Sequence, residues 1–470
     1  MRIYLLGIAG TGMGSVAGLL RKAGHEVCGS DENVYPPMSD KLAEWGIETF
    51  TPYAAANLQK SFGGRGPELC IVGNVIRAEN AEAREVRRHG YAHVSFPEAL
   101  EELFLQKSHS VVIVGTHGKT TTTSLMAAVL HSAGRDPSLL VGGVPLDFNE
   151  GFRLGKGEHF VLEGDEYDTA YFDKGPKFLH YRPRTAIFTG AEFDHADIYR
   201  DLAHYECAFE KFVPLLPADG YLAACATFDN WKKIVAPAKC KVETYSATKA
   251  ADWTARGLTL GPDGAKFEVL YRNVADSQMT LNAAGRHNVE NALGVYAACR
   301  ALGLSSAEIG RGFASFKGVK RRQELRGIAK GVRVIDDFAH HPTAVRETIA
   351  AVAAQHPGQR LIAVFEPRSN TAMRKIHQDE YAHAFAGAAE AIISQPTAIA
   401  KVPEADRVDA KKMAAEIGQS GVPCRWMESP DAIVAALAAE AKDGDVVLAM
   451  SNGAFGNLHK KLLAALEARK

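Results

Sequence analysis

The chain lacks the features that mark several classes of protein. Its 470 residues carry a formal net charge of −1, so no charged surface for nucleic acid or anionic lipid is expected. Its seven cysteines are scattered without a C-x-x-C pair, which excludes a disulfide scaffold and argues against a zinc site. No apolar run approaches the roughly 18 residues of a membrane span. These absences predict a cytoplasmic protein with no nucleic-acid or membrane partner.

What is present is an alternation of strand-like and helix-like segments. This alternation predicts an α/β protein with mainly parallel, doubly wound sheets, and the length suggests roughly three domains of about 150 residues. Breaks near 106–109 and 318–327 divide the chain into predicted domains 1–108, 109–326 and 327–470. Residues 245–281 alternate apolar and polar side chains, which predicts an antiparallel patch on the central domain. Buried strands are expected at 2–6, 69–72, 111–114, 160–162, 185–189, 333–335, 361–365 and 445–450.

The first glycine loop follows the first predicted strand and has the sequence GIAGTGMG, from Gly7 to Gly14. A secretory signal would not be interrupted by so many glycines, so a strand followed by a loop explains this segment better. Backbone amides of such a loop can approach a diphosphate at a helix N-terminus, and Asp31, after the next strand, can bind a ribose. The strict G-x-G-x-x-G spacing is not met. A nicotinamide dinucleotide, another nucleotide diphosphate and a purely structural turn therefore all stay open.

The second glycine loop, GTHGKTTT, follows the strand expected at 111–114. Gly118-Lys119-Thr120 is the core of a phosphate-binding loop, in which Lys119 reaches the β- and γ-phosphates and the Thr120 hydroxyl can ligate Mg²⁺. The glycine that usually lies five residues before Gly118 is absent, so the loop is a shortened variant. A helix is expected to begin near Thr123.

Two acidic runs follow the next strands of the central domain, EGDEYD from Glu163 and EFDHADIY from Glu192. Several carboxylates at a strand end repel one another unless a cation lies among them, and Mg²⁺ prefers oxygen ligands. His195 is as well suited to orient a ligand as to bind a metal. The basic cluster Lys320-Arg321-Arg322 contains two residues, Lys320 and Arg321, that fit a solvated linker.

In their order along the chain, these motifs resemble the Mur ligase family. The matching strings are GIAGTGMG with GSD, GTHGKTTT, EGDEYD, EFDHADIY, GRHNVENA, KRRQELRG, DDFAHHPT, EPRSNT and MSNGAFG. Three features depart from common family patterns: Gly190 stands where relatives often have asparagine, and Ala9 and Phe338 replace a glycine and a tyrosine of the alanine-adding members. The resemblance implies a first domain for a UDP-sugar, a second for ATP, and a third for the incoming amine.

The resemblance also implies roles for residues at matching positions. The UDP-sugar would contact the first loop and the end of the next strand, through Gly7, Ile8, Ala9, Gly10, Thr11, Gly12, Met13, Ser30 and Asp31. ATP would be bound by Gly115, Thr116, His117, Gly118, Lys119, Thr120, Thr121, His287, Asn288, Asn291, Arg322, Asp336 and His340. Mg²⁺ would be held by Thr120 and Glu163, with His195 at a second ion. The peptide would face Arg368, Ser369 and Asn370. The groups implied in catalysis are Lys119, His195 and Arg322.

Five strings resemble those members that join UDP-N-acetylmuramate to the tripeptide L-Ala-γ-D-Glu-meso-diaminopimelate in peptidoglycan recycling: GSDENVYPPMSD, FDKGPKFLHYRPR, EFDHADIY, DDFAHHPT and EPRSNTAM. The resemblance implies an acyl-phosphate intermediate and a monomer or weak homodimer. A ligase that adds L-alanine to UDP-N-acetylmuramate is the alternative within the family, and a folate-polyglutamate-type ligase is a weaker one. An NAD-dependent dehydrogenase and a P-loop switch protein are alternatives from other classes.

Overall fold

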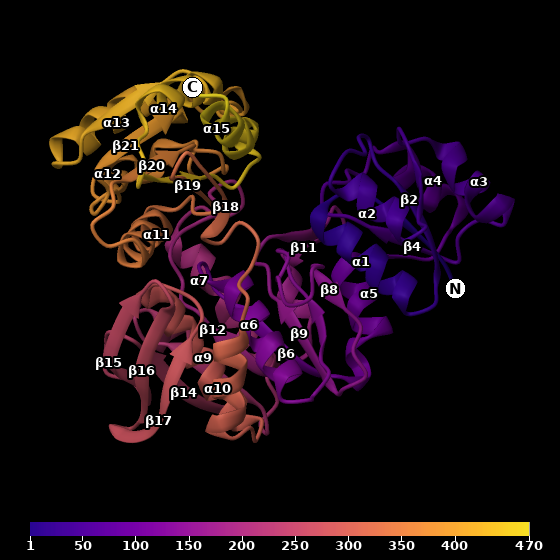
Figure 1. The fold of residues 1–470 in the computed structure, drawn as a ribbon. Coiled ribbons are helices and arrows are strands. Elements are labelled where there is room, and N and C mark those ends of the chain that lie inside the picture. The colour runs from indigo at the N-terminus through magenta and orange to yellow at the C-terminus, as the bar shows by residue number, and fades with distance from the viewer. Residues whose placement is uncertain (470) are drawn as a thin grey trace. The chain divides into compact units, whose positions relative to one another are not determined.

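A computed structural model describes residues 1–469 (Figure 1). The chain divides into two compact units. The first unit contains Met1–Glu192, Leu202–Trp253 and Leu293–Phe313. The second contains Phe193–Asp201, Thr254–Ala292 and the residues from Ala314 onward.

The N-terminal sheet of the first unit is parallel, with strand order β3-β2-β1-β4-β5. Its strands are β1 Arg2–Leu6, β2 Glu26–Ser30, β3 Glu48–Phe50, β4 Leu69–Val72 and β5 His93–Ser95. Its helices are α1 Thr11–Lys22, α2 Met38–Glu44, α3 Ala55–Gly64, α4 Ala81–His89 and α5 Phe96–Leu103. The strand order reverses between β1 and β4, and a crevice for a ligand forms at such a switch point, beyond the carboxyl ends of the strands.

The central sheet of the first unit has the order β14-β13-β12-β6-β9-β7-β8, and all neighbours except β7 and β8 are parallel. Its strands are β6 His109–Val114, β7 Ser138–Leu140, β8 Phe152–Arg153, β9 His159–Glu163, β12 Pro183–Phe188, β13 Tyr221–Cys225 and β14 Lys241–Ser246. A two-stranded ribbon, β10 Asp168–Ala170 and β11 Asp173–Pro176, leads into the 3-10 helix η2 Lys177–His180. The other helices are α6 Lys119–Ser132, α7 Leu202–Phe212 and α8 Trp231–Val235, with 3-10 helices η1 Leu105–Lys107 and η3 Val213–Leu215.

The chain passes between the units within three elements, β15 Trp253–Gly261, α9 Arg286–Ala301 and α10 Ser306–Ser315. In the second unit, β16 Gly264–Tyr271 and β17 Val274–Leu281 form an antiparallel hairpin.

The main sheet of the second unit has the order β18-β19-β23-β20-β21-β22, and only β18 is antiparallel to its neighbour. Its strands are β18 Glu324–Ala329, β19 Val332–Asp337, β20 Leu361–Phe365, β21 Glu390–Ser394, β22 Cys424–Met427 and β23 Val446–Met450. The helices are α11 Pro342–Gln355, α12 Gln378–Tyr381, α13 Ala410–Gln419, α14 Pro430–Glu440 and α15 Leu458–Glu467, with 3-10 helices η4 Lys375–His377, η5 Ile399–Lys401, η6 Glu404–Asp406 and η7 Phe455–Asn457. Two apolar clusters form its core, because its central strands are buried on both faces.

The eight strands expected from apolar runs are all present, each within two residues of its expected ends at most. Two expectations were wrong in detail. Tyr245 does not belong to the antiparallel patch, because β14 pairs in parallel with β13. The helix after the second glycine loop begins at Lys119 rather than near Thr123, because Gly118 adopts a left-handed conformation and caps it. Between residues 1 and 469, no helix has both the length and the hydrophobicity needed to cross a bilayer.

Candidate active site

The first glycine loop is fastened to the end of β2. The amides of Gly7 and Ile8 donate to the carbonyl of Ser30 over 2.9 and 3.0 Å, and the amide of Ala9 donates to Asp31 Oδ2 over 2.9 Å. Gly7 has a φ of +86°, which suits glycine. Helix α1 begins after Gly10 without a side-chain cap, so its first amides point toward an open end and can bind an anion.

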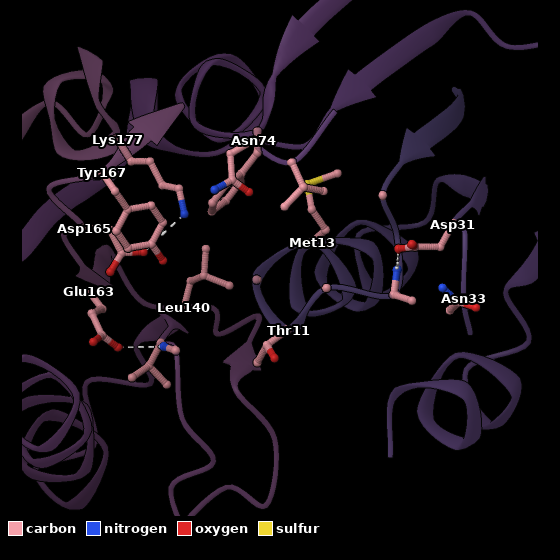
Figure 2. Close-up of a pocket in the computed structure, with 18 of the residues that line it drawn as sticks. Thr11, Met13, Asp31, Asn33, Asn74, Leu140, Glu163, Asp165, Tyr167 and Lys177 are labelled. Carbon is pink, nitrogen blue, oxygen red and sulfur yellow. Dashed lines mark hydrogen bonds and ion pairs between the residues drawn. The ribbon is translucent and has the colours of Figure 1, made fainter. Parts of the chain in front are cut away.

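A cavity of about 500 Å³ lies beside this loop in the first unit (Figure 2). The predicted site residues in its lining are Gly7, Ala9, Gly10, Thr11, Gly12, Met13, Asp31 and Glu163. Ile8 and Ser30 were predicted to contact the same ligand, but neither belongs to the lining. Ile8 is fully buried, and the Ser30 hydroxyl donates to the buried carboxyl of Glu82. The side chains of Ile8 and Ser30 therefore support the loop from the protein interior rather than from the cavity.

The cavity is also lined by residues that received no individual role from the sequence. These residues are Asn33, Tyr35, Asn74, Val75, Phe96, Leu140, Val141, Gly142, Asp165, Tyr167, Lys177 and Tyr181. Asn74 and Val75 follow β4, so the rule that ligands bind at the carboxyl ends of parallel strands could have found them. Lys177 directly follows the ribbon after the acidic run, and only the fold shows that the ribbon brings it to the cavity.

The second glycine loop requires glycine at two positions. Gly115 has a φ of +131°, and a Cβ atom there would lie 2.3 Å from Thr189 Oγ1. Gly118 has a φ of +76° and precedes α6 directly. The loop is fastened to the end of β12, because the Thr116 amide donates to the Gly190 carbonyl over 2.9 Å. A phosphate can therefore approach the backbone of the loop closely.

Lys119 is folded back onto its own loop. Its Nζ donates to the carbonyl of Gly115 over 2.6 Å and to the two carboxylate oxygens of Glu166 over 2.8 and 3.0 Å. Glu166 is buried and accepts a further hydrogen bond from Tyr205. Burial alone would lower the pKa of Lys119, but Glu166 and Asp165 outweigh it and raise that pKa above its ordinary value. The lysine is thus held as a cation beside the loop.

Thr120 and Glu163, the two predicted Mg²⁺ ligands, are in contact. The Thr120 hydroxyl donates to Glu163 Oε1 over 2.7 Å, and the Gly142 amide donates to Glu163 Oε2 over 2.6 Å. Burial, followed by the charge of Asp165, raises the pKa of Glu163. A half-buried carboxylate next to a hydroxyl and a second carboxylate is a donor set that fits Mg²⁺, which prefers oxygen.

The remaining predicted residues of this loop lie around the same strand ends. His117 Nε2 lies 2.9 Å from Glu192 Oε2, which fixes the ring against the start of the second acidic run. Thr121 is half-buried in the first turn of α6. Gly190, where relatives often carry asparagine, packs against Phe228, and a Cβ atom there would lie 2.4 Å from its ring. The aromatic contact explains why a side chain is excluded from this position.

In the second unit, the residues predicted to bind adenine lie in the first turns of α9. Asn291 Nδ2 donates to Asn288 Oδ1 over 3.4 Å, so the two amide side chains share one helix face as their spacing predicted. His287 is half-buried, and its desolvation together with the nearby Arg322 lowers its pKa to about 4. The imidazole is therefore neutral at physiological pH and presents one donor and one acceptor.

Arg321 is not the solvated linker residue that the sequence suggested. Its guanidinium donates to the carbonyls of Ser451 and Gly453 over 2.7 and 2.6 Å and lies 3.4 Å from Asp336. Arg322, predicted for the nucleotide, stacks over Phe338 with its guanidinium carbon 4.9 Å from the ring centre. Both arginines thus belong to the structure around β19, since a guanidinium can stack and donate at once.

The second acidic run meets the predicted peptide loop within the second unit. His340 Nε2 lies 3.7 Å from Asp194 Oδ2, and Asn370 Nδ2 donates to Asp197 Oδ2 over 2.9 Å. Burial would raise the pKa of Asp194, but its hydrogen bond with His340 and the charge of His195 hold that pKa well below its ordinary range.

The other two predicted peptide residues lie beside this contact. Arg368 packs on the backbone of Gly453, where a Cβ atom would come within 2.9 Å of its side chain. The Ser369 hydroxyl accepts from the Ala372 amide over 3.0 Å and shapes the loop. The structure thus brings His195, His340 and the loop from Arg368 to Asn370 into one region of this unit.

Comparison with known proteins shows which family has this arrangement of motifs. Three family models match in order: the Mur ligase family catalytic domain at residues 2–108, the Mur ligase middle domain at 113–299, and the Mur ligase glutamate ligase domain at 321–453. The chain is 39% identical to the UDP-N-acetylmuramate–L-alanyl-γ-D-glutamyl-meso-2,6-diaminoheptandioate ligase of Escherichia coli K12, over 99% of this chain and 98% of that protein. The chain belongs to the Mur ligase family.

Two further comparisons place this Mur ligase among its relatives. It is 31% identical to the UDP-N-acetylmuramate–L-alanine ligase of Acetivibrio thermocellus, over 96% of this chain and 93% of that one. It superposes on the crystal structure of a murein peptide ligase from Psychrobacter arcticus with a TM-score of 0.74 and 35% identity, covering 100% and 99% of the two chains. The predicted class, an α/β fold of three Mur ligase domains with a small antiparallel patch, is confirmed; the exact boundaries at 108 and 326 stay a prediction.

Proposed function

We propose that this Mur ligase uses ATP to join UDP-N-acetylmuramate to L-Ala-γ-D-Glu-meso-diaminopimelate through an amide bond, in the recycling of peptidoglycan. The relative from Escherichia coli carries that activity in its name and is 39% identical over nearly the whole chain. We further propose that the enzyme works in the cytoplasm, where ATP is available, as a monomer or weak homodimer.

The observation that carries the proposal is the double position of Glu163. Its carboxylate lines the cavity beside the first glycine loop and also accepts a hydrogen bond from Thr120 of the second loop. A sugar nucleotide in the cavity and a triphosphate on the second loop would therefore meet at Glu163. An acid-activating ligase needs this arrangement, because the carboxylate of one substrate must reach the terminal phosphate of the other.

The reaction follows from this meeting point. A carboxylate oxygen of the muramyl group attacks the γ-phosphorus of ATP, the bond to the β-phosphate oxygen breaks, and ADP leaves. The ammonium group of Lys119 leaves Glu166, binds the phosphates and offsets the charge on the phosphoryl oxygens. Thr120 and Glu163 would hold Mg²⁺, with His195 at a second ion, and the ions would supply further charge neutralisation.

In the second step the α-amine of the tripeptide attacks the acyl carbon, and phosphate leaves. The amine loses a proton to His195, to a carboxylate of the second acidic run or to the phosphate itself. Neutral His287 with Asn288 and Asn291 would hold the adenine, and Arg322, Asp336 and His340 would complete the nucleotide site. Arg368 would bind a peptide carboxylate through its planar fork, beside Ser369 and Asn370.

The proposal is tested by measuring ADP release with UDP-N-acetylmuramate and a panel of amine acceptors. The tripeptide should give the largest kcat/KM, and hydroxylamine should trap the acyl phosphate when no amine is supplied. A preference for L-alanine would instead assign the activity named for the 31% identical relative from Acetivibrio thermocellus. No response to UDP-N-acetylmuramate with any amine would refute both assignments.

A further inference from the structure

Lys177 is a buried lysine that lines the cavity and has no part in the reaction described above. Only 5% of the residue is exposed, and it is the first residue of η2, directly after the ribbon strand β11. Figure 2 shows its ammonium group pointing toward the cavity beside Asp165 and Tyr167. A buried ammonium is costly unless its charge and its donors are used.

The partners of Lys177 do not use all of its hydrogen-bond donors. Its Nζ lies 3.3 Å from Asp165 Oδ2, 4.1 Å from the ring centre of Tyr167 and 5.0 Å from that of Phe96. Among residues 1–469, Asp165 is the one carboxylate at ion-pair distance from it. An ammonium group has three N–H donors, and among residues 1–469 the one side chain that accepts a hydrogen bond from Lys177 is Asp165, so a further acceptor in the cavity can bind it.

The charge of the cavity points to the kind of acceptor. Within residues 1–469, the lining contains three carboxylates, those of Asp31, Glu163 and Asp165, whereas Lys177 is the one lysine or arginine in it. A UDP-linked muramic acid carries a diphosphate and, at the other end of the sugar, a lactyl carboxylate. The open amides at the start of α1 suit the diphosphate. The carboxylate then needs a cation of its own.

The position of Lys177 in the cavity agrees with this division. Figure 2 shows Lys177, Asp165 and Glu163 on one side and Asp31 with Asn33 on the other. A nucleotide whose ribose lies near Asp31 and whose diphosphate lies at α1 extends its sugar toward Glu163. There its carboxylate must lie, because Glu163 contacts Thr120 of the phosphate-binding loop.

We propose that Lys177 binds the lactyl carboxylate of the sugar nucleotide and positions it for phosphorylation. One carboxylate oxygen accepts a hydrogen bond from Nζ, and the other faces the γ-phosphate. Asp165 and the two aromatic rings hold the ammonium in place. This inference rests on the proposed function, since it assumes that the cavity takes an acidic UDP-sugar.

The experiment is a calorimetric titration of the full chain, without ATP, with UDP, UDP-N-acetylglucosamine and UDP-N-acetylmuramate. The second ligand differs from the third by lacking the lactyl group, so the affinity ratio of the two isolates that group. The variants are Lys177→Met, which keeps the apolar stem, and Lys177→Arg, which keeps the charge. Lys174→Met is the matched control, because Lys174 lies three residues away, is exposed, and pairs with Asp168 over 3.1 Å.

We expect the wild type and Lys174→Met to prefer UDP-N-acetylmuramate over UDP-N-acetylglucosamine. Lys177→Met should lose about tenfold to a hundredfold in affinity for UDP-N-acetylmuramate, the range for one hydrogen bond to a charged group, and bind the other two ligands within about twofold of wild type. Lys177→Arg should keep part of the preference. In turnover, the KM for UDP-N-acetylmuramate should rise more than the KM for ATP.

Equal weakening of all three ligands in Lys177→Met would place Lys177 at the diphosphate or in the support of the fold, and would overturn the inference. An unchanged preference in that variant would overturn it as well. The wild type provides a test that does not depend on any variant folding: if it binds both UDP-sugars equally well, no cation recognises the carboxylate. If the wild type binds none of the three ligands, the proposed function itself fails.

Discussion

The two glycine loops of the first unit have similar backbones but differ in the charged side chains that they contain and contact. Each follows a buried parallel strand and leads into a helix, and each is tied to the end of a neighbouring strand by its amides. The first loop contains no charged side chain, and Asp31 accepts a hydrogen bond from the amide of Ala9. The second contains Lys119 and lies beside Glu163 and Glu166. Under the proposed function, the same backbone arrangement has two uses: the first loop would bind an anion that stays intact, and the second would bind one that reacts.

The largest effect should come from removing the cation of the second loop. Lys119→Ala should lower ADP release by about a thousandfold, because the charge that develops on the transferred phosphoryl group loses the cation that Lys119 supplies. Calorimetric binding of UDP-N-acetylmuramate should stay within about twofold of wild type. Steady-state ADP release checks the first statement. A variant with more than a tenth of the wild-type rate would contradict the role of Lys119.

The second-largest difference between the two loops should come from adding one methyl group to a glycine in each. Gly115→Ala places a Cβ atom 2.3 Å from Thr189 Oγ1 at a φ of +131°, whereas Gly10→Ala meets its nearest atom, the Gly7 carbonyl oxygen, at 3.6 Å. Strain of this kind costs about 1–3 kcal/mol before the clash is counted. Gly115→Ala should therefore bind ATP at least about a hundredfold more weakly and lower Tm, while Gly10→Ala should change both little. Similar losses in the two variants would show that the steric argument is wrong.

The pH dependence of stability should sharpen the contrast between charged and neutral groups. His287 has its pKa lowered to about 4 by burial and Arg322, whereas the unfolded chain binds the proton near pH 6.5. The unfolded state therefore takes up more protons between these values, so stability is full above pH 6.5 and falls as the pH drops toward 4. The loss should reach about 3 kcal/mol.

The control for this pH effect is His287→Gln, which keeps a polar side chain without a titrating group. Its Tm should fall less than that of wild type when both are scanned by calorimetry from pH 7 to pH 4. Parallel curves for the two proteins would exclude His287 as the source. A Tm that falls as the pH rises above 7 would also be inconsistent with a lowered pKa of His287.

The smallest effect should come from loosening the first loop. Asp31→Asn weakens the hydrogen bond that Asp31 Oδ2 accepts from the Ala9 amide over 2.9 Å. The affinity for UDP should fall about tenfold, the effect of one charge-assisted hydrogen bond, and the affinity for ATP should not change. Titrations with UDP and ATP measure both. A larger effect on ATP than on UDP would refute the assignment of separate ligands to the two loops.

The sequence was sufficient for the parts of the fold that repeat a local pattern. The strand before each glycine loop was predicted because buried parallel strands are continuous apolar runs, and Lys119 was found because the residues around it are adjacent in the chain. The contact between Thr120 and Glu163 followed from the same logic, since both lie at the carboxyl edge of one sheet.

The sequence was insufficient where side chains meet through tertiary packing. Ser30 is the last residue of strand β2, where a binding residue is expected, yet its hydroxyl donates to Glu82 of a distant helix. Arg321 resembles a linker residue, yet the carbonyls of Ser451 and Gly453 hold it. Lys177 could not be assigned because a ribbon with no apolar pattern carries it to the cavity. In each case the deciding partner lies more than 50 residues away or in an element without periodicity.

The contact between Lys119 and Glu166 has a consequence for how the enzyme treats its product. With Glu166 in place, the positive charge of Lys119 is already compensated, so an arriving anion must compete with the Glu166 carboxylate. A lone orthophosphate would have to displace Glu166 with few contacts in return, whereas a triphosphate brings many. The internal carboxylate of Glu166 would thus favour release of the orthophosphate product and binding of a new ATP molecule.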